Sequence, residues 1–175
     1  MRLLLLLTCF LLSLPLFSQK SYDSTKLNVC ARNIISGIVN DPGHTTDQSR
    51  FWNDFDLLKK QVSTVELLEM VNHPNALIRV KAFNFLLDLA YPKFVDILEE
   101  HIYDTAEVSL QSGCIITTLP VIQAMLFSIS TNNAWIGALE FTQADMDRVA
   151  RISDRAFGRK QNCGSTTNKK FTFEE

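Results

Sequence analysis

The sequence predicts an all-α protein of stacked antiparallel helical hairpins with flanking capping helices, in one domain over residues 19–158. Apolar residues recur at steps of three and four along most of this stretch, as they do on one face of a helix. Ser63 to Glu66 reads as a capping box, the sequence signature of a helix start. The pattern that follows Ser63 recurs more weakly about thirty residues later. We therefore place two hairpins at about residues 63–129.

Composition restricts the kinds of partner. The chain has 175 residues, 46% of them hydrophobic and 21% charged, with a net charge of −2, which suits one compact domain. A protein that binds nucleic acid needs a basic patch for the phosphates, so we expect no nucleic-acid partner. The nearest thing to such a patch is interspersed with aspartates, and we interpret it as a solvated helix face; it consists of Arg148, Arg151, Arg155, Arg159 and Lys160.

The N-terminus has the pattern of a secretory signal peptide. Arg2 supplies a positive charge, an apolar run covers residues 3–17, and the small residue Ser18 ends it. The run is short for a membrane span. We expect residues 1–18 to be removed, leaving Gln19 first. The mature protein is then extracytoplasmic, periplasmic or secreted, without stable membrane insertion.

Two amphipathic helices precede the hairpins and are expected to cap them. The first presents one apolar face; its members are Leu27, Cys30, Ala31, Ile34, Ile35 and Ile38. The second begins near Thr45 and has an apolar face of Phe51, Phe55, Leu58 and Val62. Cys30 is therefore interpreted as a core residue.

The first hairpin surrounds a turn at His73 to Asn75. Pro74 disfavours helical geometry in the residue before it, so the helix that starts at Ser63 ends there. A second helix is expected from about Ala76 to Tyr91. Its apolar residues cover two sides, which predicts packing on two sides. Arg79 falls inside this apolar arc, and a buried guanidinium needs a carboxylate or carbonyl partner because it cannot lose its charge.

The second hairpin is predicted from the shifted pattern. A helix ends near Ile102, and residues 104–107 resemble a cap for another helix that carries Val108 and Leu110. Residues 113–120 are ambiguous, and a helix of about residues 119–128 follows them. A last helix starts after a capping pattern at residues 142–145, whereas the conformation of residues 134–141 stays open. The tail at 159–175 is polar, and its Phe171 to Phe173 is able to dock as a short strand.

The segment from Ser63 to about Ile129 resembles HEAT-like repeats. His73 to Leu86 looks like the turn and inner helix of that family, where a proline follows a usually acidic residue and a valine or isoleucine precedes an arginine. Here His73 stands at the acidic position and Arg79 follows Ile78. The second copy has Ser109 in place of the arginine. The resemblance implies stacked hairpins whose usual role is protein binding, with occasional enzymes.

The strongest metal-like cluster is His101 with Glu100 and Asp104. A zinc site needs three or four converging ligands, and neither His44 nor His73 has a reason to join it. We therefore predict no metal and no cofactor, and interpret these residues as a solvated helix end.

The mature chain contains three cysteines, Cys30, Cys114 and Cys163. Export permits a disulfide. If one forms, we expect it to join Cys114 to Cys163, because both lie in irregular segments that can reach disulfide geometry. A nucleophilic role for Cys114 lacks a visible base or positive neighbour, so a buried thiol is the other reading.

No catalytic constellation is visible in the sequence, so protein binding through the hairpins is the expected function. The structural residues expected to support it are Ser63, Glu66, Pro74 and Arg79. Two alternatives stay open. One is a hydrolase or lyase with a site assembled between hairpins, and the other is a structural or inhibitor module.

The signal peptide yields the first prediction. The intact mass of the exported protein should correspond to a chain that begins at Gln19, because the cleavage pattern ends at Ser18. Mass spectrometry of the extracytoplasmic fraction measures this. A protein that stays in the membrane fraction with residues 1–18 attached contradicts it.

Overall fold

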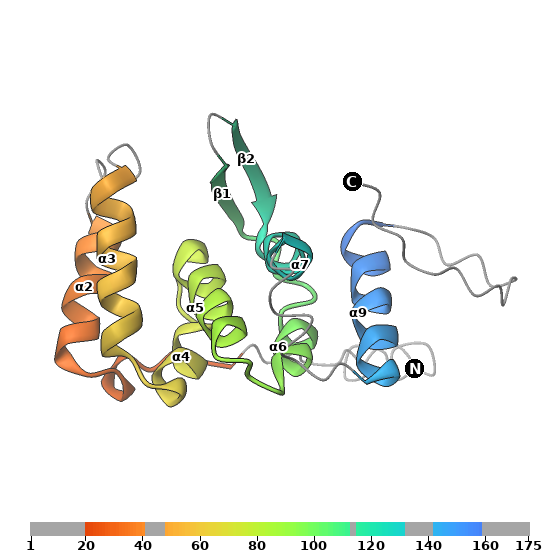
Figure 1. Cartoon of the computed structure of the whole chain (residues 1–175), viewed down its shortest axis with the longest axis horizontal. Helices are drawn as coiled ribbons and strands as arrows, with labels where there is room; N and C mark the ends of the chain where they lie inside the picture. The colour runs from red at the N-terminus through yellow and green to blue at the C-terminus, as the bar shows by residue number, and fades with distance from the viewer. Residues whose placement is uncertain (1–19, 41–47, 113–114, 132–141, 159–175) are drawn as a thin grey trace, which may run out of the picture.

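The computed structural model describes residues 20–40, 48–112, 115–131 and 142–158. This part of the chain is mostly helical, with one small antiparallel sheet (Figure 1). The elements in order are η1 (Ser24–Lys26), α2 (Val29–Asn40), α3 (Gln48–Gln61), α4 (Thr64–Met70), α5 (Ala76–Asp88), α6 (Phe94–Glu100), β1 (Glu107–Ser112), β2 (Ile115–Pro120), α7 (Val121–Thr131) and α9 (Gln143–Ala156). The expected signal peptide, the start of the second helix near Thr45, residues 134–141 and the tail lie outside the described residues.

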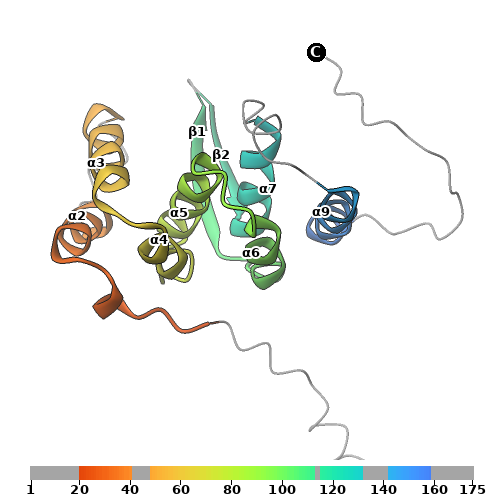
Figure 2. The same ribbon diagram turned by 60° about the horizontal axis from the view of Figure 1, so that its bottom comes forward.

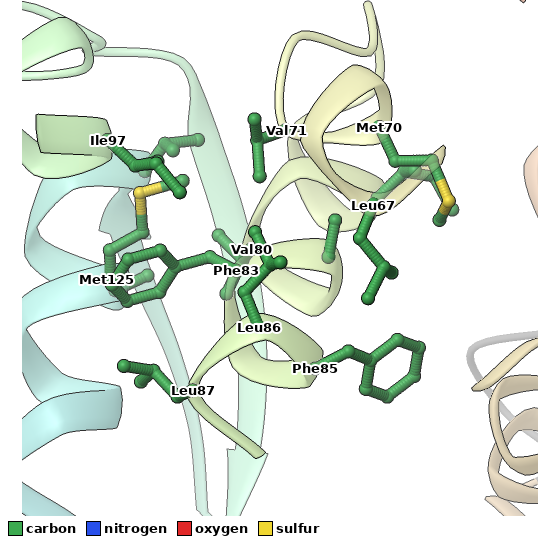
Figure 3. Packing of buried hydrophobic residues seen from close by; sticks show 14 of the residues in the cluster. Leu67, Met70, Val71, Val80, Phe83, Phe85, Leu86, Leu87, Ile97 and Met125 are labelled. Carbon is green, nitrogen blue, oxygen red and sulfur yellow. The ribbon is translucent and has the colours of Figure 1, made fainter. Parts of the chain in front are cut away.

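Helix α5 is the central element of the core and is packed on two sides. Figure 3 shows Leu67 and Met70 of α4 on one side of α5, and Met125 of α7 beside Phe83 on the other. All of these side chains are buried. The expectation that a helix apolar on two sides is packed on two sides is confirmed, because α4 and α7 cover opposite faces of α5.

Both ends of α5 are set by local hydrogen bonds. The Asn75 side chain accepts from the backbone N–H of Leu77 at 2.9 Å, which caps the start. At the other end Ala90 has a positive φ of 51°, and the N–H of the next residue, Tyr91, donates to the Leu86 carbonyl at 3.0 Å. This left-handed turn ends the helix at Asp88, earlier than the expected Tyr91.

The expected helix after Asp104 is wrong, because Glu107–Ser112 is a β-strand. It pairs antiparallel with Ile115–Pro120, and Val108 lies opposite Leu119. Val108 and Leu110 are two residues apart, which is the period of a strand that buries one face. Val108 accordingly enters the core while Ser109 is exposed. The second predicted helical hairpin is therefore replaced by a β-hairpin, and the all-α prediction holds only as mostly helical.

Helices α2 and α3 pack against each other at one end of the molecule (Figure 1). The ring of Phe55 in α3 lies edge-on to that of Phe85 in α5, and Lys81 Nζ lies 4.4 Å from the ring centre of Trp52. The Lys59 ammonium also pairs with Asp88. The expectation that Cys30 is in the core is wrong: its thiol is exposed, since the buried face of α2 is made by Ala31, Ile35 and Ile38.

The segment before α2 is anchored on α4 by carboxylates. The buried Glu69 accepts from the backbone N–H of Asp23 and pairs with Lys26 at 3.1 Å. Glu66 accepts from the backbone N–H of Asn28 at 2.7 Å. These contacts hold residues 23–28 against the hairpin formed by α4 and α5.

Helix α9 packs against α6 and α7 at the opposite end (Figures 1 and 2). It starts with a capping box between Thr142 and Asp145. The basic face of α9, which was expected to be only solvated, connects this helix to α6. Arg148 pairs there with Asp96 at 2.6 Å and with Glu99 at 2.7 Å. Within the described ranges, no helix has both the length and the apolar character required to cross a membrane.

Candidate functional site: a buried arginine, aspartate and histidine cluster

The most distinctive polar group in the core surrounds Arg79, which is only 6% exposed. Its Nη1 donates to the carbonyl oxygens of His73 at 2.7 Å and Pro74 at 2.8 Å. Its Nη2 donates to Asp104 Oδ1 at 3.0 Å, and Nε lies 2.8 Å from Asp104 Oδ2. The guanidinium thus has the carbonyl and carboxylate partners that its place in the apolar arc requires.

Asp104 joins the cluster to the start of the β-hairpin. Besides Arg79, its carboxylate accepts from the backbone N–H of Ala106 at 3.2 Å. Burial by itself raises the pKa of Asp104, but the hydrogen bonds from His101 and Arg79 and the charge of Arg79 outweigh it and hold that pKa below its usual value. The carboxylate is therefore ionised at neutral pH and complements the guanidinium.

His101 completes the cluster and is only 1% exposed. Its Nδ1 lies 3.2 Å from Asp104 Oδ2, whereas its buried Nε2 has no hydrogen-bond partner among the residues that the structure describes. The interpretation of His101 and Asp104 as a solvated helix end is wrong, because both residues come just after α6 and are buried in the core. Glu100, the third residue of that cluster, is exposed instead.

His73 forms the turn that Arg79 holds. Its ring Nδ1 accepts from the backbone N–H of Asn75 at 3.0 Å, and the ring of Tyr22 packs edge-on against it at 4.6 Å between centroids. An aspartate oxygen makes the same bond to the second residue after it in an Asx turn. Burial lowers the pKa of His73, and the nearby charge of Arg79 lowers it further.

The other predicted structural residues lie around this cluster at different points. Pro74 contributes a carbonyl to Arg79. Ser63 and Glu66 form both hydrogen bonds of a capping box at the start of α4, and Glu66 additionally binds Asn28. Cys114 and Cys163 lie outside the described residues, so the expected disulfide stays a prediction. In the described ranges no group of three or more His, Cys, Asp or Glu side chains is placed to hold a metal ion.

The geometry of the cluster makes it a connector between three segments. Arg79 holds the α4–α5 turn, Asp104 holds the entry to β1, and His101 holds the end of α6. All three side chains are buried, so the ionised pair is shielded from solvent and a substrate has no direct access to His101. Sequence reasoning found Arg79 but missed Asp104 as its partner; the signal was the polar His101 and Asp104 pair placed three residues apart next to an apolar helix.

Comparison with known proteins gives no further guide to this site. No protein-family model matches the chain, and no curated protein or solved structure matches it either.

The second prediction concerns Arg79. Changing Arg79 to Ala should lower the free energy of unfolding by about 3–5 kcal/mol, because Asp104 keeps its charge in the core without a partner. Urea unfolding measures the loss. Arg148→Ala is the matched control: its ion pairs are largely exposed, so the expected loss is about 1 kcal/mol or less. Equal losses in the two variants contradict the structural role of Arg79.

The third prediction concerns pH. The pKa of His73 is lowered in the folded state, so the unfolded chain takes up a proton more readily. The stability that the neutral ring contributes is complete above a pH of about 6.5 and is lost as the pH falls through the folded pKa. For one proton the slope cannot exceed about 1.4 kcal/mol per pH unit.

Urea unfolding between pH 7.5 and 5 measures this slope. In the variant His73→Asn, the side-chain oxygen accepts from the Asn75 N–H without titrating. The variant should keep most of its stability at pH 7.5 and have a shallower slope below pH 6.5. Identical slopes in the two proteins show that another group is responsible.

Proposed function

We propose that the protein acts by binding another protein through the β1–β2 hairpin, without turning over a substrate. The observation that carries this proposal is Ile116, which is 67% exposed on the outer face of the hairpin. Figure 1 shows that the hairpin projects beyond α5 and α7. A large apolar side chain on a projecting element is accessible to a partner, and its burial on binding is favourable.

The two faces of the hairpin differ in a way that suits recognition. The inner face places Val108 in the core opposite Leu119. On the outer face, Ser109 and Thr118 lie opposite each other with their hydroxyl oxygens 3.2 Å apart. Ile116 lies on the same face, two residues before Thr118. An apolar residue beside small hydroxyl side chains offers a partner both burial and hydrogen bonds.

The base of the hairpin is held by the buried cluster, which supports pre-organisation of the surface. Asp104 binds the backbone of Ala106 before β1. The Ala106 carbonyl in turn accepts from the N–H of Val121, which follows β2, at 2.9 Å. Both ends of the hairpin are thereby connected to Arg79. A binding element that is ordered before association loses less entropy when its partner arrives.

The wider setting of the proposal comes from the sequence. The α4–α5 pair serves as a HEAT-like unit that carries the hairpin, and the N-terminal pattern directs the protein out of the cytoplasm. The proposed partner is an extracytoplasmic protein. An enzyme built on His101 is less well supported, because the groups that contact it are buried with it.

The fourth prediction tests the hairpin surface. A partner is captured from an extracytoplasmic extract, purified, and titrated by calorimetry. Ile116→Glu should weaken its binding at least tenfold, because a charge replaces the apolar contact at the centre of the proposed surface. Melting temperatures should stay unchanged, since Ile116 is exposed.

Val65→Glu provides the matched control. Val65 is 70% exposed on α4, so the same charge is added away from the hairpin, and binding should be retained. Equal affinity of the two variants contradicts the hairpin as the contact surface. Turnover in a screen of hydrolase and lyase substrates, together with the absence of a stable partner, contradicts the binding function.

A further inference from the structure

Strand β2 has an edge that no strand of the described residues pairs with. Among the described residues the sheet contains β1 and β2 alone, so within this part of the chain each strand is paired along one edge. Strand β1 packs against α5, and in both Figure 1 and Figure 2 β2 lies on the side of β1 that faces α7 and α9. A row of unpaired N–H and C=O groups is a template for another strand.

Helix α9 brings the chain close to the base of this edge. Gln123 lies in the first turn of α7, directly after β2, and its Nε2 donates to the Ala156 carbonyl at 2.9 Å. Gly158 then takes a left-handed φ of 64°, with its N–H bound to the Arg155 carbonyl at 3.2 Å. This turn ends α9, so the chain leaves the helix beside the point where β2 ends.

The chain beyond Gly158 contains one segment with the pattern of a strand. Phe171, Thr172 and Phe173 are residues that favour strands, and they place both aromatic rings on one face. On β2, Thr117 and Leu119 share the inner face with the same spacing of two. Leu119 is only partly buried, so apolar surface remains there for an aromatic ring to cover.

We propose that residues 170–174 pair with the free edge of β2 as a third strand, with Phe171 and Phe173 beside Thr117 and Leu119. An aromatic side chain beside a β-branched one such as Thr117 on the neighbouring strand stabilises a sheet. A two-stranded hairpin is marginally stable by itself, and a third strand with an apolar face reinforces it. This inference concerns a segment of the same chain and does not depend on the proposed partner.

The length of the connection fits this pairing. The twelve residues 159–170 separate Gly158 from Phe171. A flexible connection of this length has an average end-to-end distance of about 20 Å, and a strand of six residues is also about 20 Å long. When the length of a linker matches the span, the effective concentration is in the millimolar range, which favours the tail over a second copy of the chain.

Hydrogen exchange of the backbone amides of β2 tests the proposal. The full mature chain is compared with a chain that ends at Gly158. Amides of β2 should exchange at least tenfold faster in the shortened chain, because their new partner strand is missing. A synthetic peptide of residues 168–175, added at millimolar concentration, should restore the slower exchange.

Substitutions in the tail distinguish strand pairing from a general effect of the tail. The double variant Phe171→Glu and Phe173→Glu should behave like the shortened chain, whereas Thr172→Glu, on the opposite face of the strand, should behave like wild type. Equal exchange of β2 in the full and shortened chains overturns the proposal. Protection in the shortened chain that disappears on dilution also overturns it, since a second copy then covers the edge.

Discussion

A buried positive charge is the constraint on which much of this structure depends. Arg79 sits among apolar side chains in the central helix and cannot be neutralised there, so the surrounding chain must supply oxygen acceptors. It does so with two turn carbonyls and with Asp104. These acceptors belong to the segment before α5 and to the segment before β1. Their convergence on one guanidinium determines how the α4–α5 turn and the hairpin are placed relative to each other.

Such a pair is better understood as a source of geometry than of stability. Removing two charges from water costs several kcal/mol each, and their attraction roughly offsets this cost when the geometry is good. A shifted hairpin, however, leaves the guanidinium without its carboxylate and is penalised strongly. The cluster therefore selects one arrangement of α5, α6 and β1 among those with a similar apolar core.

Local sequence patterns predicted the parts of this structure that local interactions determine. The two apolar sides of α5 indicated its central position, and the apolar surroundings of Arg79 indicated that it needs a partner. The identity of that partner was not predictable, because Asp104 lies 25 residues further along the chain. His101 was misplaced for the same reason: its burial follows from the packing of α6, which a local pattern of polar residues does not reveal.

The β-hairpin shows a different limit of prediction from local sequence patterns. Val108 and Leu110 matched core positions of the preceding unit, but a spacing of two fits a strand as well as a short piece of helix. The side chain of Asp104 was expected to cap a helix, but in the structure it binds Arg79 and His101 instead. Cys30 was misjudged because the apolar face of α2 is narrower than its sequence indicates, so that Ala31 is buried and the adjacent thiol is exposed.

The alanine at the end of α5 has a consequence for how this protein tolerates change. Ala90 adopts a left-handed conformation in which its Cβ approaches the following carbonyl oxygen, at a cost of about 1–2 kcal/mol. Glycine takes this conformation without that contact. The chain thus lies below the stability that its own backbone permits. The substitution Ala90→Gly would therefore increase the free energy of unfolding. This added stability would let the protein stay folded with destabilising substitutions elsewhere, including those at a binding surface.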